Sequence, residues 1–116
     1  MNSFRLNAVG NLAKDPELTK TKTTTYVKFS LIGNDYAGEE KGEVQTTIFF
    51  VAFGPMAEAL AKNARVGDQL IVEATIRSNN YKDKNDEMQY GYSFIVDGFR
   101  FGAPGKAKRE EFRKAG

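Results

Sequence analysis

Residues 44–77 read VQTTIFFVAFGPMAEALAKNARVGDQLIVEATIR, and this stretch decides the fold because it holds a strand, a helix and a strand in succession. Alternating side chains predict the first strand over Val44–Phe53. Gly54-Pro55 interrupts it, and the proline suits the first turn of a helix because its missing N–H would have no partner there. Apolar residues at helical spacing then predict one short helix that ends near Asn63, and alternation resumes in a strand over Gln69–Arg77.

The strand Val44–Phe53 carries apolar side chains on both of its faces. Ile48, Phe50 and Ala52 share the first face, and Thr47, Phe49, Val51 and Phe53 share the second. An antiparallel strand usually leaves one face to water, so the second face is predicted to be covered by a ligand or by another subunit. Phe49 and Phe53 are therefore expected to point away from the core, with core packing of both rings as the alternative.

Three further strands and three connecting segments are predicted on either side of this stretch. Strands are expected over 4–9, with Phe4, Leu6 and Ala8 on the buried face, over 26–34, with Val27, Phe29 and Leu31 on one face, and over 90–101. Residues 11–25 are expected to form a loop or turn with a β-compatible end, 35–42 a hairpin loop and 78–89 a long hairpin turn.

The predicted order along the chain is three strands, one helix and two strands. This is the linear plan of an all-β, five-stranded OB-fold Greek-key barrel, in which one short helix lies between strands 3 and 4 and closes one end. Another small barrel, of SH3-like or cold-shock type, is the alternative. The helix inserted between the two strands favours the OB-fold.

Composition argues against several classes of function. The 116 residues suit one domain with one hydrophobic core. The chain contains no Cys and no His, which removes thiolate nucleophiles, imidazole bases and the nitrogen and sulfur ligands of most metal sites. We therefore expect neither an enzyme nor a bound metal or cofactor. No apolar run approaches the roughly 20 residues of a membrane span, and the first residues lack a secretory signal, so we expect no membrane contact and a cytoplasmic, nucleoid-associated location.

Charge is unevenly distributed along the chain. Residues 1–101 carry 12 basic and 13 acidic side chains, whereas residues 102–116 carry five basic and two acidic ones. These two ranges are predicted to be an OB-fold domain and a basic, flexible C-terminal tail, separated at Ala103-Pro104-Gly105. Because the domain is nearly neutral, binding to nucleic acid requires its basic residues to gather on one face.

Aromatic and basic side chains on the outward faces of strands and at hairpin ends are the candidate nucleic-acid contacts. Unpaired bases stack on aromatic rings, and cations follow the phosphates. The predicted stacking rings are Tyr36, Phe49, Phe53 and Tyr81, and the predicted phosphate contacts are Arg5, Lys28, Arg77, Lys82 and Lys84. Tyr26, Tyr90 and Tyr92 stay open, because hairpin or subunit contacts explain them equally well. For each tyrosine and each cation, a solvated surface side chain is the alternative.

Short motifs along the first hundred residues resemble those of the bacterial single-stranded DNA-binding proteins. They are, in order, Val9-Gly10-Asn11-Leu12, Asp15-Pro16-Glu17-Leu18, the strand Val27–Leu31, Phe53-Gly54 with Ala57-Glu58, Val66-Gly67, Val72-Glu73, Tyr81-Lys82-Asp83 and Val96-Asp97. The resemblance implies an OB-fold domain that assembles into homotetramers, with a dimer as the other possibility, and that wraps single-stranded DNA. It also implies a disordered tail whose acidic, Phe-terminated tip recruits replication and repair proteins.

This chain departs from that family pattern in two ways. It has no Trp, and the places where family members hold stacking Trp residues match Tyr36, Phe53 and Tyr81 here. Tyr and Phe rings also stack on bases, with less contact area. The sequence ends in EEFRKAG rather than in an acidic tip, so recruitment of partner proteins through the tail is not expected.

Three functions remain open on the sequence. The leading one is sequence-nonspecific binding and protection of single-stranded DNA during replication, recombination or repair. The second is a primosome-type OB-fold module that docks proteins and binds nucleic acid weakly. The third is a single-strand nuclease, for which Asp83, Asp86 and Glu87 would have to hold a metal ion.

Overall fold

Strands dominate the computed structural model, which describes residues 2–36, 38–40, 42–89 and 91–103. Its elements are β1 (Phe4–Leu12), β2 (Glu17–Lys20), β3 (Thr25–Tyr36), β4 (Glu43–Phe53), α1 (Gly54–Asn63), β5 (Gln69–Ser78), β6 (Tyr81–Lys82), β7 (Met88–Gln89) and β8 (Tyr92–Phe101). Most of the predicted tail lies outside the described residues. Its first two residues still belong to the barrel edge, because Gly102 N–H donates to the Gln69 carbonyl and Gln69 N–H donates to the Ala103 carbonyl.

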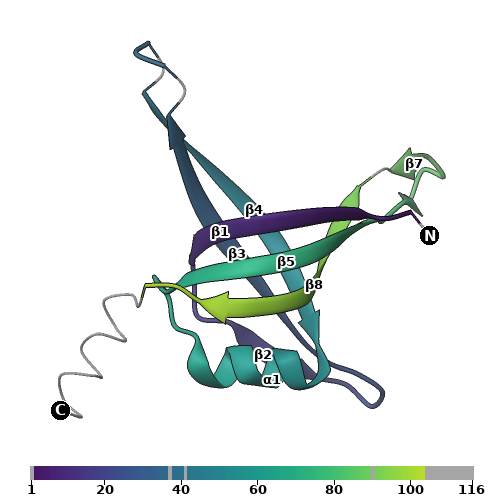
Figure 1. The fold of residues 1–116 in the computed structure, drawn as a ribbon. Helices are drawn as coiled ribbons and strands as arrows, with labels where there is room; N and C mark the ends of the chain where they lie inside the picture. Colours follow the sequence, from purple (N-terminus) through teal and green to yellow (C-terminus); the bar gives the residue numbers. More distant parts are fainter. Residues whose placement is uncertain (1, 37, 41, 90, 104–116) are drawn as a thin grey trace.

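Five of the strands close into a barrel. The sheet order is β1-β5-β8-β4-β3-β2, and a further antiparallel pairing of β1 with β3 closes the five strands β1, β5, β8, β4 and β3, while β2 pairs with β3 at the edge. In that closing contact Asn11 lies opposite Ile32, and Leu12 lies opposite Leu31. The five predicted strands are the barrel strands β1, β3, β4, β5 and β8, and α1 lies between the third and fourth of them, so the predicted OB-fold is confirmed (Figure 1).

The inward faces of the barrel strands form the core. Alternation along β3 and β4 buries Val27, Phe29, Leu31, Phe50 and Ala52, as the sequence predicts. Helix α1 begins with a proline in its first turn and covers one end of the barrel with its buried Ala57 and Leu60 (Figure 1). At ten residues α1 is short, and among the described residues no helix has the length and apolarity to span a bilayer.

Two local predictions are wrong, and a third is incomplete. The segment predicted as a loop over 11–25 contains the end of β1 and the strand β2, which pairs with β3. The long hairpin turn predicted over 78–89 does connect the antiparallel strands β5 and β8, but it also contains the small hairpin β6–β7, which was not predicted. Phe4, predicted on the buried face, is 78% exposed, because it lies at the first residue of β1, where the strand leaves the barrel. Short polar strands lack the apolar alternation that identifies a half-buried strand.

Candidate nucleic-acid interface

The outward face of β3 and β4 brings two of the four predicted rings, Phe49 and Phe53, together with the predicted cation Lys28. Cross-strand register places Lys28 opposite Val51 and Ser30 opposite Phe49. Phe49 is 72% exposed and Phe53 is 44% exposed, so both rings point away from the core, as the alternation predicts. Core packing of these two rings is therefore wrong.

Tyr26 joins this group through direct ring contacts. Its ring centroid lies 6.3 Å from that of Phe53, which is opposite it in the β3–β4 register. Lys28 Nζ lies 5.9 Å from the centre of the Tyr26 ring, within the range of a cation–π interaction. We call the set Tyr26, Lys28, Phe49 and Phe53 the central face. Its three exposed or half-exposed rings and one cation can offer stacking surface and a counter-charge side by side.

Two hollows flank Phe49, one on either side of it. The β8-side hollow, of about 330 Å³, is lined by Lys28, Phe49, Phe50, Val51, Tyr92, Ser93 and Phe94. The β2-side hollow, of about 480 Å³, is lined by Lys14, Asp15, Glu17, Lys28, Phe29, Ser30 and Phe49. Lys28 and Phe49 line both hollows, so a chain of nucleotides could cross from one hollow to the other over them.

Tyr92, which sequence reasoning left open, and Lys14, which it missed, also line the two hollows. Tyr92 is 71% exposed and lines the β8-side hollow, and Lys14 lines the β2-side hollow. Lys14 follows the end of β1, whereas Phe49 is 35 residues further along the chain. No local pattern links them, and only the closure of the barrel brings them to the same hollow.

The predicted cations Arg77 and Arg5 lie on the neighbouring outward surface. Arg77 on β5 is opposite Ser93, which lines the β8-side hollow, and Arg5 on β1 is opposite Thr75. Both arginines are exposed. They extend the cationic surface from the central face across β8 and β5 to β1. An acidic group interrupts this path, since Thr75 Oγ1 donates a hydrogen bond to Asp97 Oδ2 on β8.

The other predicted contacts lie on two hairpins away from the central face (Figure 1). Tyr36 is 66% exposed at the far end of β3, opposite Glu43. It is six residues beyond Ser30, the residue opposite Phe49, which is about 20 Å along an extended strand. Tyr81 is 58% exposed and lies with Lys82 on β6, and Lys84 lies in the following turn.

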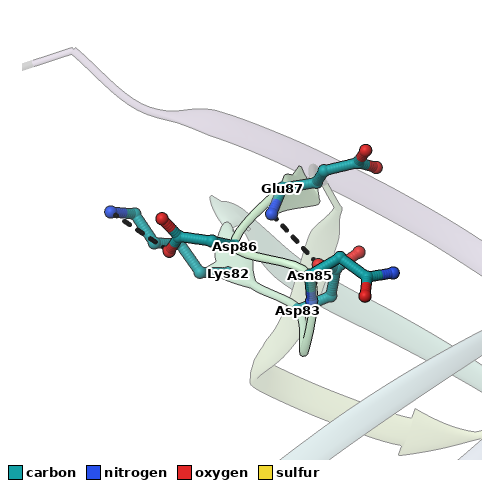
Figure 2. Close-up of polar contacts among 5 residues, drawn as sticks. All are labelled: Lys82, Asp83, Asn85, Asp86 and Glu87. Carbon is teal, nitrogen blue, oxygen red and sulfur yellow. Dashed lines mark hydrogen bonds and ion pairs between the residues drawn. The ribbon is translucent and has the colours of Figure 1, made fainter.

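The β6–β7 turn is organised by one carboxylate (Figure 2). Asp83 Oδ1 accepts hydrogen bonds from the backbone N–H groups of Asn85, at 2.9 Å, and Glu87, at 3.0 Å, while Oδ2 accepts one from Gln89 Nε2 at 2.8 Å. The hydrogen bond from Glu87 is the main cause that lowers the pKa of Asp83 below the usual range. Asp86 pairs with Lys82 at 3.8 Å. These acids serve the turn, and among the described residues no three His, Cys, Asp or Glu side chains form a possible metal site.

Acidic pH is expected to loosen this hairpin before the barrel. Because the folded pKa of Asp83 is depressed, its carboxylate stabilises the turn fully above the ordinary aspartate pKa, and this contribution is lost as the pH falls through the lower folded value. Hydrogen exchange followed by NMR should show protection of the Asn85 and Glu87 amides falling severalfold over that range. In Asp83→Asn the same loss should be present at neutral pH, and unchanged protection there would contradict the role of the charge.

Comparisons with known proteins agree with this geometry. The model of the Single-strand binding protein family matches residues 1–102. The chain is 30% identical over 95 residues to the single-stranded DNA-binding protein of Clostridium perfringens, covering 80% of this chain but only 61% of that protein. It is also 30% identical over 95 residues to single-stranded DNA-binding protein 1 of Streptococcus pyogenes, covering 80% and 72% of the two chains. The chain therefore spans about three fifths to three quarters of these relatives.

Solved structures share the fold at low sequence identity. The small single-stranded DNA-binding protein from Streptomyces coelicolor superposes with a TM-score of 0.67 at 19% identity, covering 88% of this chain and 96% of that one. The mitochondrial single-stranded DNA binding protein from S. cerevisiae superposes with a TM-score of 0.74 at 15% identity, covering 90% and 100%. The family match over residues 1–102, together with the barrel and its exposed rings, shows that the chain belongs to the single-strand binding protein family.

Proposed function

We propose that this chain binds single-stranded DNA with little sequence preference and protects it during replication, recombination or repair. The observation that carries the proposal is the exposed ring of Phe49, which stands with Lys28 between two hollows. The names of the curated relatives, all single-stranded DNA-binding proteins, support it. Membership of this family also supports a binding protein rather than an enzyme.

Binding would combine stacking with phosphate contacts. Bases stack on Phe49 and Phe53, and each such contact is worth about 1–3 kcal/mol in proteins of this kind. Lys28 neutralises the phosphates beside the rings, and Arg77 and Arg5 continue this role toward β1. Rings accept any base because every base has a π-face, which explains the low sequence preference.

The two hairpins would contact longer strands. Tyr36 on the β3–β4 hairpin, and Tyr81, Lys82 and Lys84 around the β6–β7 turn, lie outside the central face. Each of the two tyrosines is more than half exposed, so its ring is accessible to a base. We propose that these residues bind nucleotides that leave the central face, so that removing them affects long oligonucleotides more than short ones.

A titration with thymidine oligomers tests the proposal. Stacking should quench the intrinsic tyrosine fluorescence in a saturable way, because Tyr26 and Tyr92 lie beside the bound bases. A duplex of equal length should give little response, since its bases are not free to stack. A protein-docking module would show no such quenching, and absence of binding to the single strand would contradict the proposal.

We further propose that the chain works as a homotetramer. Val9 on the outward face of β1 is 59% exposed and lies opposite Ile71 on β5, so an apolar strip is open on this side of the barrel. A second subunit would bury it. Sedimentation of the free protein and of its complex with a thymidine oligomer measures the number of subunits, and a monomer at all concentrations would contradict this assembly.

Salt dependence should identify Lys28 as a phosphate contact. For single strands the logarithm of the binding constant falls with the logarithm of salt concentration by about 0.7 for each neutralised phosphate. Lys28→Ala should therefore weaken binding to all sequences and make this slope shallower by about 0.7. Lys62→Ala, which removes an exposed cation at the end of α1, is the control and should leave the slope unchanged. Equal slopes for wild type and Lys28→Ala would exclude the contact.

A further inference from the structure

The β8-side hollow lies where strands β4 and β8 part. Across the described residues, the register of these two strands consists of one parallel pair, Val51 with Ile95, whereas β4 pairs with β3 along its whole length. The residues that precede this pair on both strands line the hollow instead: Phe49, Phe50, Tyr92, Ser93 and Phe94. The hollow is therefore a gap in the barrel wall. Its volume of about 330 Å³ is near the lower end of the range for small-molecule sites, about 300–1,000 Å³, so it suits a single base.

The floor of this hollow is apolar and is held by the core. Phe50 lines the hollow although it is only 2% exposed, so it must lie at the bottom. Its ring centroid is 5.4 Å from that of Phe29 in the core and 5.9 Å from that of Phe94, which also lines the hollow. Because a close-packed core resists rearrangement, this floor is already formed before a ligand binds.

Two exposed rings and one cation stand above the floor. Phe49 is 72% exposed and Tyr92 is 71% exposed, and they belong to the two strands that border the gap. Lys28 is the one charged side chain among the described residues of the lining. The hollow thus offers ring faces to a base, a cation to the neighbouring phosphate and an apolar surface to whatever edge of the base points inward.

The apolar floor determines which edge of a pyrimidine can point inward. The Watson–Crick edge carries polar groups, which would lose their water against phenylalanine rings without gaining partners. The C5 edge of thymine carries a methyl group instead, and proteins recognise this group by apolar contacts, including contacts with phenylalanine. Uracil has the same polar groups as thymine but lacks the methyl group. A thymine therefore gains a buried methyl group in this hollow that a uracil does not.

We propose that the β8-side hollow is a base subsite that stacks one thymine on the rim formed by Phe49 and Tyr92, with the C5 methyl group of the base against Phe50 and Phe94. The inference rests on the proposed function and deepens it, because it makes Tyr92 a residue that discriminates thymine from uracil, the corresponding base of RNA. Phe53 is not among the described residues of this lining, so stacking on its ring stays indifferent to the methyl group.

The test compares oligomers of thymidine and of deoxyuridine of equal length, which share their sugar and their Watson–Crick edge. The wild-type chain should bind the thymidine oligomer about fourfold more tightly at equal salt, which is the effect of burying one methyl group. Tyr92→Ala should weaken binding of the thymidine oligomer by about tenfold and bring the ratio of the two affinities close to one. Tyr92→Phe keeps the ring and should keep the ratio. Because Tyr92 is exposed, the fold should tolerate both changes.

Phe53→Ala is the matched control, since it removes a ring of the central face that is not part of the described lining. It should weaken binding of both oligomers by a similar factor and keep the fourfold ratio. A ratio near one in the wild type, an unchanged ratio in Tyr92→Ala, or an equal fall of the ratio in Phe53→Ala would overturn the subsite while leaving the proposed function standing. Failure of both oligomers to bind the wild-type chain would overturn the proposed function and the subsite together.

Discussion

Replacing Phe49 and Phe53 together by alanine is expected to weaken binding to a thymidine oligomer by about a hundredfold or more. Each stacked base is worth about 1–3 kcal/mol, and 1.4 kcal/mol corresponds to a factor of ten. The two rings are four residues apart on one strand, or roughly 13 Å, so their contributions should add. Fluorescence anisotropy of a labelled oligomer at fixed salt measures the loss.

The fold should tolerate this double substitution. Both rings are exposed on the outward face of β4, whereas the core of that strand is made by Phe50 and Ala52. Phe4→Ala is the matched control, since Phe4 is 78% exposed but lies outside the central face. An equal loss of affinity in the control, or unchanged affinity in a folded double variant, would show that the central face does not stack bases.

Alternation along the strands was sufficient to predict the barrel strands and the outward positions of Phe49 and Phe53, whereas the place of Tyr26 in the central face stayed open. The side chains of a strand point alternately to its two faces. The inward position of Phe50 and the outward positions of Phe49 and Phe53 therefore follow from the sequence alone. The same rule fails for β2 and for the β6–β7 hairpin. These elements are short and polar, and their strand conformation comes from pairing with a neighbour and not from their own pattern.

The hollows beside Phe49 could not be predicted in this way. Their linings combine the segment after β1, the middle of β3 and β4, and the first residues of β8. Which of these segments meet depends on strand order and on barrel closure. The sequence could also not show how far the candidate residues on the hairpins lie from the central face. Tyr36 is on the same outward face of the sheet as Phe49, but β3 is long enough that Tyr36 lies at the far end of a hairpin.

Gly10→Ala is expected to destabilise the protein by about 1–3 kcal/mol, although it adds a single methyl group. Gly10 is buried at the point where β1 reaches β3 and the barrel closes. A Cβ atom there would lie 2.9 Å from the backbone oxygen of Ile32 and 3.1 Å from Cβ of Leu31. Because one of these atoms belongs to the backbone, the strands themselves would have to separate. Urea unfolding at several protein concentrations measures the change.

A second glycine in the barrel distinguishes this close approach from the general effect of a methyl group. At Gly33 the corresponding Cβ atom would have only the Thr46 backbone oxygen near it, at 4.0 Å, so Gly33→Ala should be neutral or stabilising by about 0.4–1 kcal/mol. Equal stability of the two variants would mean that β1 can move away from β3 at little cost.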